Sequence, residues 1–123
     1  MASQPKKILI VEDEQPLAKA LKLKLLNFGF RPRLAADGQE ALDYLKKEKF
    51  DLVLLDLVMP NVSGFDVLKK MLADKNKTPV IVTSNLGQEE DLKKVEKLGV
   101  KKYFIKSDVN IIDIINYIKD FLK

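Results

Sequence analysis

Short runs of apolar residues alternate with longer amphipathic stretches along the whole chain, and this alternation constrains the fold more than any other feature. The apolar runs, which we expect to form strands, cover residues 8–11, 31–36, 52–55, 79–82 and 103–105. The run at 52–55 has no alternation of polar and apolar residues, which indicates a strand that is covered on both faces. The sequence therefore predicts five strands, of which the second is the least apolar.

Each of these runs is followed by a stretch with apolar residues at helical spacing, so we expect five helices. They cover residues 16–28, 38–48, 65–72, 92–98 and 111–121. Asp37, with Glu40 three residues later, is predicted to cap the second helix. Gly29 and Gly99 are predicted to end the first and fourth helices. Ala41, Leu42 and Leu45 are expected to point inward. The apolar residues that mark the other four helices by their spacing are Leu17, Leu21, Leu25, Phe28, Phe65, Leu68, Leu72, Leu92, Val95, Leu98, Ile111, Ile114, Ile115, Ile118 and Phe121.

Five strands and five helices in strict alternation are typical of a parallel sheet with helices on both faces. Five strands are too few for an eight-stranded barrel, which leaves an open, doubly wound α/β sheet. The sequence has no repeat, low-complexity tract or linker. We therefore expect residues 1–123 to form a single domain.

Composition excludes several classes of function. The 123 residues include no Cys and no His, which excludes disulfides, thiol catalysis and a Ser-His-Asp mechanism. The net charge is +4, but every basic residue except Arg31 and Arg33 is a lysine, which favours a solvated surface over a direct nucleic-acid interface. No apolar run is long enough to span a membrane and the N-terminus lacks an apolar signal core, so we expect a cytoplasmic protein without membrane contact.

Polar side chains follow four of the predicted strands at the point where each strand ends. These residues are Glu12 and Asp13, Asp56, Thr83 and Ser84, and Lys106. Each alone is readily explained as a helix cap or a solvated turn, but the carboxyl ends of parallel strands share one edge of the sheet. Carboxylates without His or Cys suit Mg²⁺ or Mn²⁺, and a cation beside a carboxylate, a lysine and a hydroxyl suits a phosphoryl group.

From Lys7 to Lys123 the chain resembles the receiver domain of bacterial two-component response regulators, in particular the single-domain, chemotaxis-regulator-like kind. The segment DLVMPNVSG at 56–64 is similar to the family's D-x-x-M-P-x-x-x-G phosphorylation loop. Lys106 lies 50 positions after Asp56, as the family's lysine does. Ser84, five residues after Pro79, and Tyr103 stand where the family has its switch hydroxyl and switch aromatic residue.

The resemblance implies a flavodoxin-like sheet of strand order 2-1-3-4-5 and a phosphoacceptor, not an enzyme. Asp56 would accept a phosphoryl group from a sensor histidine kinase or a phosphotransfer protein. Asp13, Asp56 and the backbone carbonyl of Val58 would bind Mg²⁺, with Mn²⁺ as a possible substitute, and Glu12 would assist through water. Ser84 and Lys106 would hold the phosphoryl oxygens.

The resemblance also implies that Ser84 moves toward the phosphoryl group and that Tyr103 follows it inward. A downstream protein would then bind the surface of the fourth helix, fifth strand and fifth helix. Lysines outnumber acids between residues 92 and 106, where six lysines accompany only Glu96, which suits an acidic partner or a merely solvated helix. The kinase, the partner and whether the chain is free-standing or part of a longer regulator stay open.

The sequence departs from the family where Ser107 follows the lysine in place of the usual proline, and Ser107 or Asp108 is a candidate cap for the last helix. The resemblance implies that Val58 and Leu86, two positions after Asp56 and Ser84, flank the path of a hydrolytic water, and as bulky apolar residues they predict a long-lived phosphoaspartate. An aspartyl-nucleophile phosphatase would need an acid at Val58, and the glycine motifs of dinucleotide-binding and P-loop proteins are absent. The alternative that stays open is a docking module that works without phosphorylation.

Overall fold

The structure is a computed structural model that describes residues 4–123, with five strands and five α-helices in alternation. The strands are β1 (Lys7–Val11), β2 (Arg31–Ala35), β3 (Leu52–Asp56), β4 (Val80–Ser84) and β5 (Lys102–Ile105). The helices are α1 (Gln15–Asn27), α2 (Gly38–Lys47), α3 (Gly64–Ala73), α4 (Glu89–Lys97) and α5 (Ile111–Phe121). A short 3₁₀ turn, η1 (Lys106–Asp108), lies between β5 and α5.

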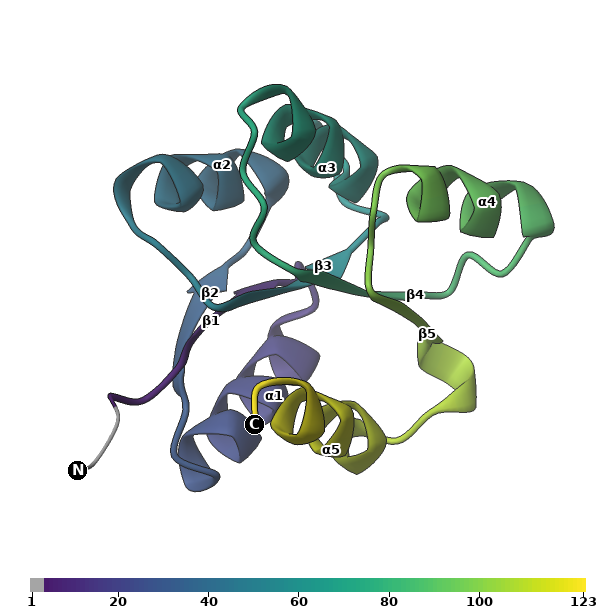
Figure 1. The fold of residues 1–123 in the computed structure, drawn as a ribbon. Coiled ribbons are helices and arrows are strands. Elements are labelled where there is room, and N and C mark those ends of the chain that lie inside the picture. The colour runs from purple at the N-terminus through teal and green to yellow at the C-terminus, as the bar shows by residue number, and fades with distance from the viewer. Residues whose placement is uncertain (1–3) are drawn as a thin grey trace.

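The strands form one parallel sheet in the order β2-β1-β3-β4-β5, which confirms the predicted fold class and strand order. Helices α2, α3 and α4 cover one face of the sheet, and α1 and α5 cover the other (Figure 1). After β1 the chain continues to β2 on one side of the sheet, and after β3 it continues to β4 and β5 on the other side. The carboxyl ends of β1 and β3 therefore lie at the point where ligands bind in sheets of this kind.

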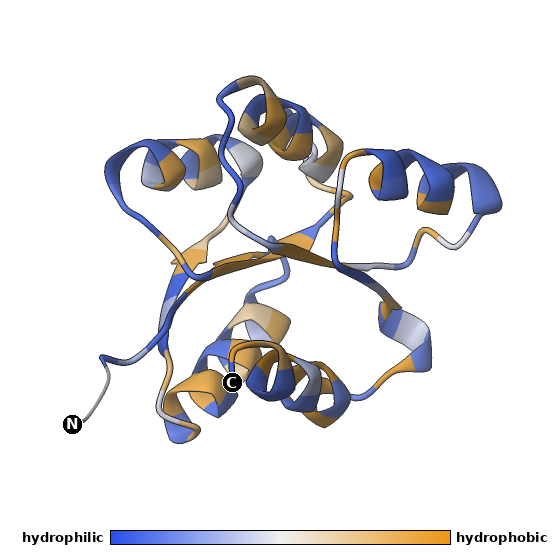
Figure 2. Cartoon of the chain, in the orientation of Figure 1, coloured by the Kyte–Doolittle hydropathy of each residue, from blue (hydrophilic) through white to orange (hydrophobic). Residues whose placement is uncertain are grey.

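Two apolar clusters, one on each face of the sheet, form the core. Ile8 and Ile10 of β1 belong to the cluster with α1 and α5, whereas Leu9 and Val11 belong to the cluster with α2, α3 and α4. The central strands β1, β3 and β4 are accordingly among the most hydrophobic parts of the chain, whereas the edge strand β2 carries Arg31 and Arg33 (Figure 2). Because both faces of the central strands are covered, neither set of alternate residues can be polar there, which explains their apolar runs in the sequence.

Three of the apolar residues that mark the predicted helices are exposed. Phe28, Leu72 and Phe121 are 41%, 60% and 38% exposed. Each lies at or just beyond the end of a helix, where the apolar stripe has already turned away from the sheet. In α3 the buried residue of the last turn is Met71, three positions after Leu68, so Leu72 at the fourth position faces outward.

The predicted cap of α2 is confirmed, because Oδ1 of Asp37 accepts a hydrogen bond of 2.8 Å from the N–H of Glu40. The prediction that Ser107 or Asp108 caps the last helix is wrong. Both residues belong to η1, and α5 begins after Asn110, whose N–H donates to Oδ2 of Asp113 at 3.2 Å. Within residues 4–123, no helix has the length and apolarity that crossing a membrane would need.

Candidate functional site

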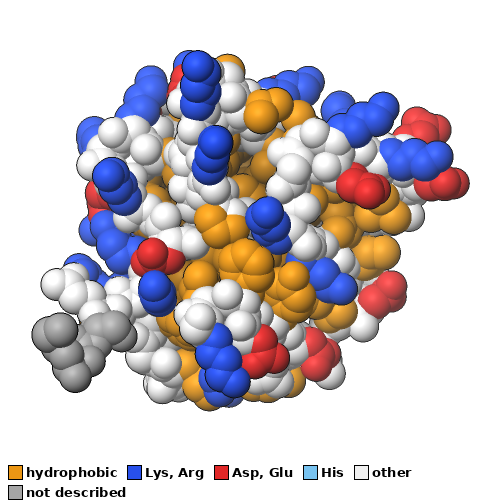
Figure 3. Space-filling view, in the orientation of Figure 1, with side chains coloured by type: hydrophobic (Ala, Val, Ile, Leu, Met, Phe, Trp, Pro, Cys, Tyr) orange, Lys and Arg blue, Asp and Glu red, His pale blue; other side chains and the backbone are white. Residues whose placement is uncertain are grey.

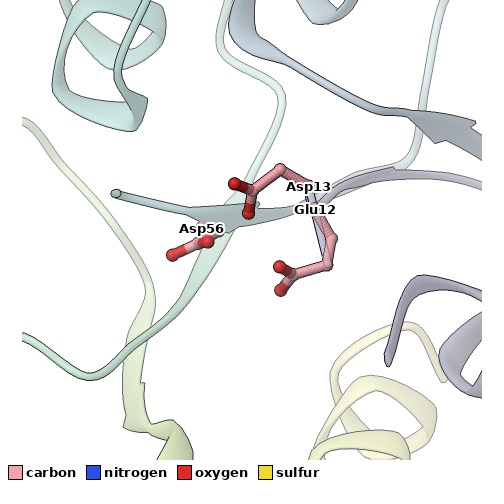
Figure 4. A group of neighbouring side chains, drawn as sticks. All are labelled: Glu12, Asp13 and Asp56. Atoms are coloured by element: carbon pink, nitrogen blue, oxygen red, sulfur yellow. The ribbon is translucent and has the colours of Figure 1, made fainter. Parts of the chain in front are cut away.

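Three acidic side chains meet at the carboxyl ends of β1 and β3. Glu12 and Asp13 directly follow β1, and Asp56 is the last residue of β3. The two strands are paired in the sheet, with Val11 opposite Leu55, so the residues after them are neighbours in space. One carboxylate oxygen from each acid lies within 4.8 Å of the other two (Figure 4).

The side chain of Lys106 reaches this group from the end of β5. Its Nζ lies 2.7 Å from Oε1 of Glu12 and 3.2 Å from Oδ2 of Asp56. All three residues are largely shielded from water, since Glu12 and Asp56 are 2% and 3% exposed and the lysine side chain is 13% exposed. One ammonium group among three carboxylates leaves the site with a net negative charge.

The electrostatics of the site favour binding of a further cation. Burial raises the pKa of Glu12, and the neighbouring Asp56 carboxylate raises it further. Burial also raises the pKa of Asp56, with a smaller contribution in the same direction from Asp13. Burial opposes the charged form of Lys106, but the contacts with the two carboxylates prevail and raise the pKa of its ammonium.

The donor set fits a hard divalent cation. All three acids offer oxygen ligands, which Mg²⁺ prefers. Oε1 of Glu12 is buried and lies 2.7 Å from the Lys106 ammonium, which is one positive charge among three acids. The excess negative charge favours a further cation at the cluster. The acidic cluster therefore fits a Mg²⁺ site.

The loop that follows β3 orients the Asp56 carboxylate. The N–H of Val58 donates to Oδ1 of Asp56 at 3.2 Å. Leu57 and Met59 on either side of Val58 are buried and anchor the loop to the core, whereas the side chain of Val58 is 57% exposed. The structure thus places the Val58 backbone beside the acid, while its role as a carbonyl ligand stays a prediction.

Gly64, the last residue of the motif at 56–64, allows the start of α3 to approach β3 closely. A Cβ atom at this position would lie 2.3 Å from the carbonyl oxygen of Asp56. The N–H of Gly64 donates to the carbonyl of Leu57 at 2.9 Å, which closes the loop. Any larger residue would push the loop away from the strand, which explains why the motif has a glycine at this position.

Ser84 and Tyr103 are joined through the backbone of Leu86. The Oγ of Ser84 accepts a hydrogen bond of 3.2 Å from the N–H of Leu86, and the hydroxyl of Tyr103 donates to the Leu86 carbonyl. Burial raises the pKa of the Tyr103 hydroxyl. Thr83 and Ser84 are both buried, so burial does not distinguish the two hydroxyls. The assignment of the switch hydroxyl to Ser84 stays a prediction. The side chain of Leu86 is half-buried and packs against the core.

Asn85 is a residue of the site region that sequence reasoning missed. Its Oδ1 accepts a hydrogen bond of 3.1 Å from the N–H of Ser107, which links the loop after β4 to the turn that carries Lys106. Proline at position 107 would lack this N–H. The replacement of proline by Ser107 was the available signal, because a free N–H needs an acceptor nearby.

The lysines between residues 92 and 106 do not form one uniform surface. Lys106 points into the acidic site and adds no charge to the surface of α4 and β5. Lys93 pairs with Glu89 at 3.2 Å, and Nζ of Lys94 lies 4.3 Å from the centre of the Phe65 ring. The basic character predicted for this surface is therefore weaker than a count of lysines suggests.

Comparison with known proteins gives one consistent result. The sequence model described as the response regulator receiver domain matches residues 8–119. The chain is 36% identical over 100 residues to the transcriptional regulatory protein DltR of Streptococcus agalactiae, in an alignment that covers 81% of this chain and 45% of DltR. The chain spans less than half the length of the curated relatives it matches.

Solved structures give the same picture. A CheY-like response regulator receiver domain protein from Methanospirillum hungatei is 28% identical with a TM-score of 0.89, covering 96% of this chain and 94% of that one. The response regulator protein TrrA from Thermotoga maritima, in complex with Mg(2+)-BeF, is 27% identical with a TM-score of 0.80, covering 94% and 97% of the two chains.

Proposed function

The chain belongs to the response regulator receiver domain family of two-component systems, and from this membership we propose that it accepts a phosphoryl group on Asp56. The donor is a sensor histidine kinase or a phosphotransfer protein. The observation that carries the proposal is the position of the Asp56 carboxylate, which is buried at a strand end between the Lys106 ammonium and the acids that follow β1.

The residues around Asp56 suit each part of this transfer. An Asp56 oxygen would attack the phosphorus of a phosphohistidine, the phosphorus–nitrogen bond would break, and an acyl phosphate would form. Lys106 and the Ser84 hydroxyl would hold phosphoryl oxygens. Mg²⁺ or Mn²⁺, held by Asp13, Asp56 and the Val58 carbonyl with Glu12 assisting through water, would neutralise charge on the transferred group.

Phosphorylation would reach the protein surface through the contacts of Leu86. If Ser84 moves toward the phosphoryl group, its bond to the Leu86 N–H must change, and the Tyr103 hydroxyl is bonded to the carbonyl of the same residue. Tyr103 lies on β5, beside α4 in the sequence. We therefore place the partner-binding surface on α4, β5 and α5.

Intact mass spectrometry after incubation with acetyl phosphate and Mg²⁺ tests the acceptor. The parent protein should gain one phosphate, the Asp56→Asn variant none, and the matched control Asp120→Asn, which changes an exposed acid on α5, should behave as the parent. A parent that gains no phosphate would reject the proposal and favour the docking module without phosphorylation. A phosphate on the Asp56→Asn variant would place the acceptor elsewhere.

Backbone NMR with beryllofluoride, a stable mimic of the phosphoryl group, tests the switch. Chemical shifts should change at Ser84 and Tyr103 and continue along α4 and β5. If the changes are confined to residues next to Asp56, the acceptor assignment survives but the proposed partner surface does not.

A further inference from the structure

A groove lies at the amino-terminal ends of the strands, where the chain enters β3 and β4. Asp56 lies at the other end of the strands. The groove consists of two cavities, one of about 620 Å³ between the C-terminal ends of α2 and α3 and one of about 290 Å³ between α3 and the loop after α4. The cavities share the residues Met71, Asn76, Lys77 and Thr78. We call the two together the distal groove.

Lysines dominate the rim of the distal groove. They are Lys46, Lys47, Lys49, Lys75, Lys77 and Lys101. The two acids of the lining already have partners, because Glu48 pairs with Lys7 and Arg33 and Asp74 pairs with Lys70. In Figure 3, basic side chains accordingly gather over α2 and α3 on this face. The rim therefore presents a net positive charge to an occupant.

Four of the six rim lysines lie outside the helices. The other two, Lys46 and Lys47, lie in the last turn of α2, where lysines offset the helix dipole. The backbone at the ends of α2 and α3 is bonded without the lysines, since the N–H of Glu48 donates to Tyr44 at 2.9 Å and the N–H of Asn76 donates to Met71 at 2.8 Å. Lys49, Lys75 and Lys77 lie beyond the helices in the two loops, and none forms an ion pair within residues 4–123.

The floor of the distal groove is apolar. It is lined by Leu42, Leu45, Phe50, Met71, Leu68, Leu72 and Leu98. Leu72 is 60% exposed, among the most exposed of the large apolar side chains in the described part of the chain. Leu72 lines the smaller cavity, and a bulky apolar side chain of a partner that packed against it would lose contact with water.

We propose that the distal groove binds an acidic peptide segment of a partner protein that carries bulky apolar side chains. The apolar side chains would lie on the floor and the carboxylates would meet the rim lysines. A nucleic acid fits less well, because the lining contains no arginine and its one aromatic ring, Phe50, is 8% exposed and offers no platform for a base. The groove lies at the opposite edge from Asp56, so binding there does not depend on the phosphorylation proposal.

Titration of the labelled protein with synthetic peptides, followed by backbone NMR, tests this assignment. The probe is a peptide of Glu, Leu and Phe, compared with one of Glu and Ser and one of Lys, Leu and Phe. Only the first should bind, with shifts at Leu45, Lys49, Lys75–Thr78 and Lys101, and its affinity should fall as salt is added. Equal binding of the Glu and Ser peptide, or shifts that map elsewhere, would overturn the proposal.

Charge reversal locates the contact. Lys75→Glu combined with Lys77→Glu should weaken binding about tenfold. The matched control is Lys22→Glu combined with Lys24→Glu on α1, at the other face of the sheet, and should leave the affinity unchanged. Circular dichroism checks that each variant is folded. If the charge-reversed variant unfolds, Lys75→Gln combined with Lys77→Gln replaces it and should show a smaller loss of affinity. Equal losses in the groove and control variants would contradict the assignment.

Two further probes test whether the groove binds a nucleic acid or a lipid surface instead. A duplex DNA oligonucleotide and a vesicle with anionic lipid should each bind more weakly than the Glu, Leu and Phe peptide at the same salt concentration. Tighter binding of either would replace the peptide as the occupant and overturn the proposal. Shifts of the groove amides on concentration of the protein alone would identify a second copy of the chain as the occupant, with the same consequence.

Discussion

The Nζ atom of Lys106 lies 3.2 Å from Oδ2 of Asp56, although the two residues are 50 positions apart in the chain. Between their strands lies β4, so the lysine side chain extends past the end of a whole strand to reach the acid. The same ammonium lies 2.7 Å from Oε1 of Glu12. Lys106 is therefore the cation that lets two buried carboxylates lie close together before any metal binds.

Replacement of Lys106 should destabilise the metal-free protein. Lys106→Met leaves Glu12 and Asp56 buried without their cation, at a cost of roughly 2 kcal/mol, below the full cost of an uncompensated buried charge because the acids can take up protons. Urea unfolding in the presence of a chelator measures the loss. The control Lys22→Met removes an exposed lysine of α1 and should change the free energy of unfolding little. Equal stabilities of the two variants would contradict the role of Lys106.

Removal of the exposed acid should have the opposite effect. Asp13→Asn eliminates a like charge that lies near Asp56, so the metal-free protein should gain about 0.5 kcal/mol, a small value because Asp13 is exposed. Mg²⁺ should raise the melting temperature of the parent, and this increase should be smaller in the variant. Thermal unfolding with and without Mg²⁺ measures both effects, with Asp120→Asn as the control. A lower melting temperature of Asp13→Asn without metal would count against repulsion in the cluster.

Gly64 should not tolerate a side chain. Gly64→Ala would place a methyl group 2.3 Å from the Asp56 carbonyl, and the resulting shift of backbone should cost about 2 kcal/mol or more. In the control Gly87→Ala, the new methyl group would meet Cδ1 of Ile105 at 3.4 Å, which a small side-chain movement relieves. Chemical unfolding of the two variants measures the difference. The close approach would be refuted by a Gly64→Ala variant as stable as the control.

The cap of α3 should make stability depend on pH. The N–H and the hydroxyl of Ser63 both donate to Oδ2 of Asp66, and these bonds lower the pKa of the Asp66 carboxyl. Since the pKa is lower in the folded state, the stabilisation is complete above the unfolded pKa of about 3.9 and is lost as the pH falls through the folded pKa. Asp66→Asn should therefore be less stable than the parent at neutral pH, and the difference should shrink in acid. Urea unfolding over a pH series measures it, and a constant difference would argue against the cap.

The apolar residues beside the site should lengthen the life of the phosphoaspartate. Val58 is exposed beside Asp56, so Val58→Asn would introduce a side chain that holds water, and addition of Leu86→Glu would introduce a second. A lowering of the barrier by about 1.4 kcal/mol would make phosphate loss tenfold faster. Phosphate release at fixed Mg²⁺ and pH measures the rate. Because Leu86 packs against the core, the double variant is compared only if its unfolding midpoint matches that of Val58→Asn. An equal or slower rate would show that shielding does not protect the bond.

Much of the fold was predictable because burial on both faces of the sheet leaves a local mark. The central strands β1, β3 and β4 had to be apolar at nearly every buried position, and each helix had to repeat its apolar residues at fixed spacing. The sequence was misleading at the helix ends, at Phe28, Leu72 and Phe121, because spacing alone does not show where burial stops, and at the start of α5, where Asn110 and not Ser107 or Asp108 is the cap.

The candidate site was predictable in part for a similar reason. Polar residues at the ends of otherwise apolar strands predicted that Glu12, Asp13, Asp56 and Lys106 lie together, because parallel strands bring their carboxyl ends to one end of the sheet. The choice of Ser84 over Thr83 rested on the resemblance and stays a prediction. What the sequence determined by itself was therefore the set of elements and the edge at which the polar side chains gather. The contacts of Lys106 with both acids, the bond from Ser107 to Asn85 and the approach of Gly64 to Asp56 were decided by the tertiary structure alone. Each of these distances depends on the twist of the sheet or on the path of a loop, which no local pattern of residues encodes.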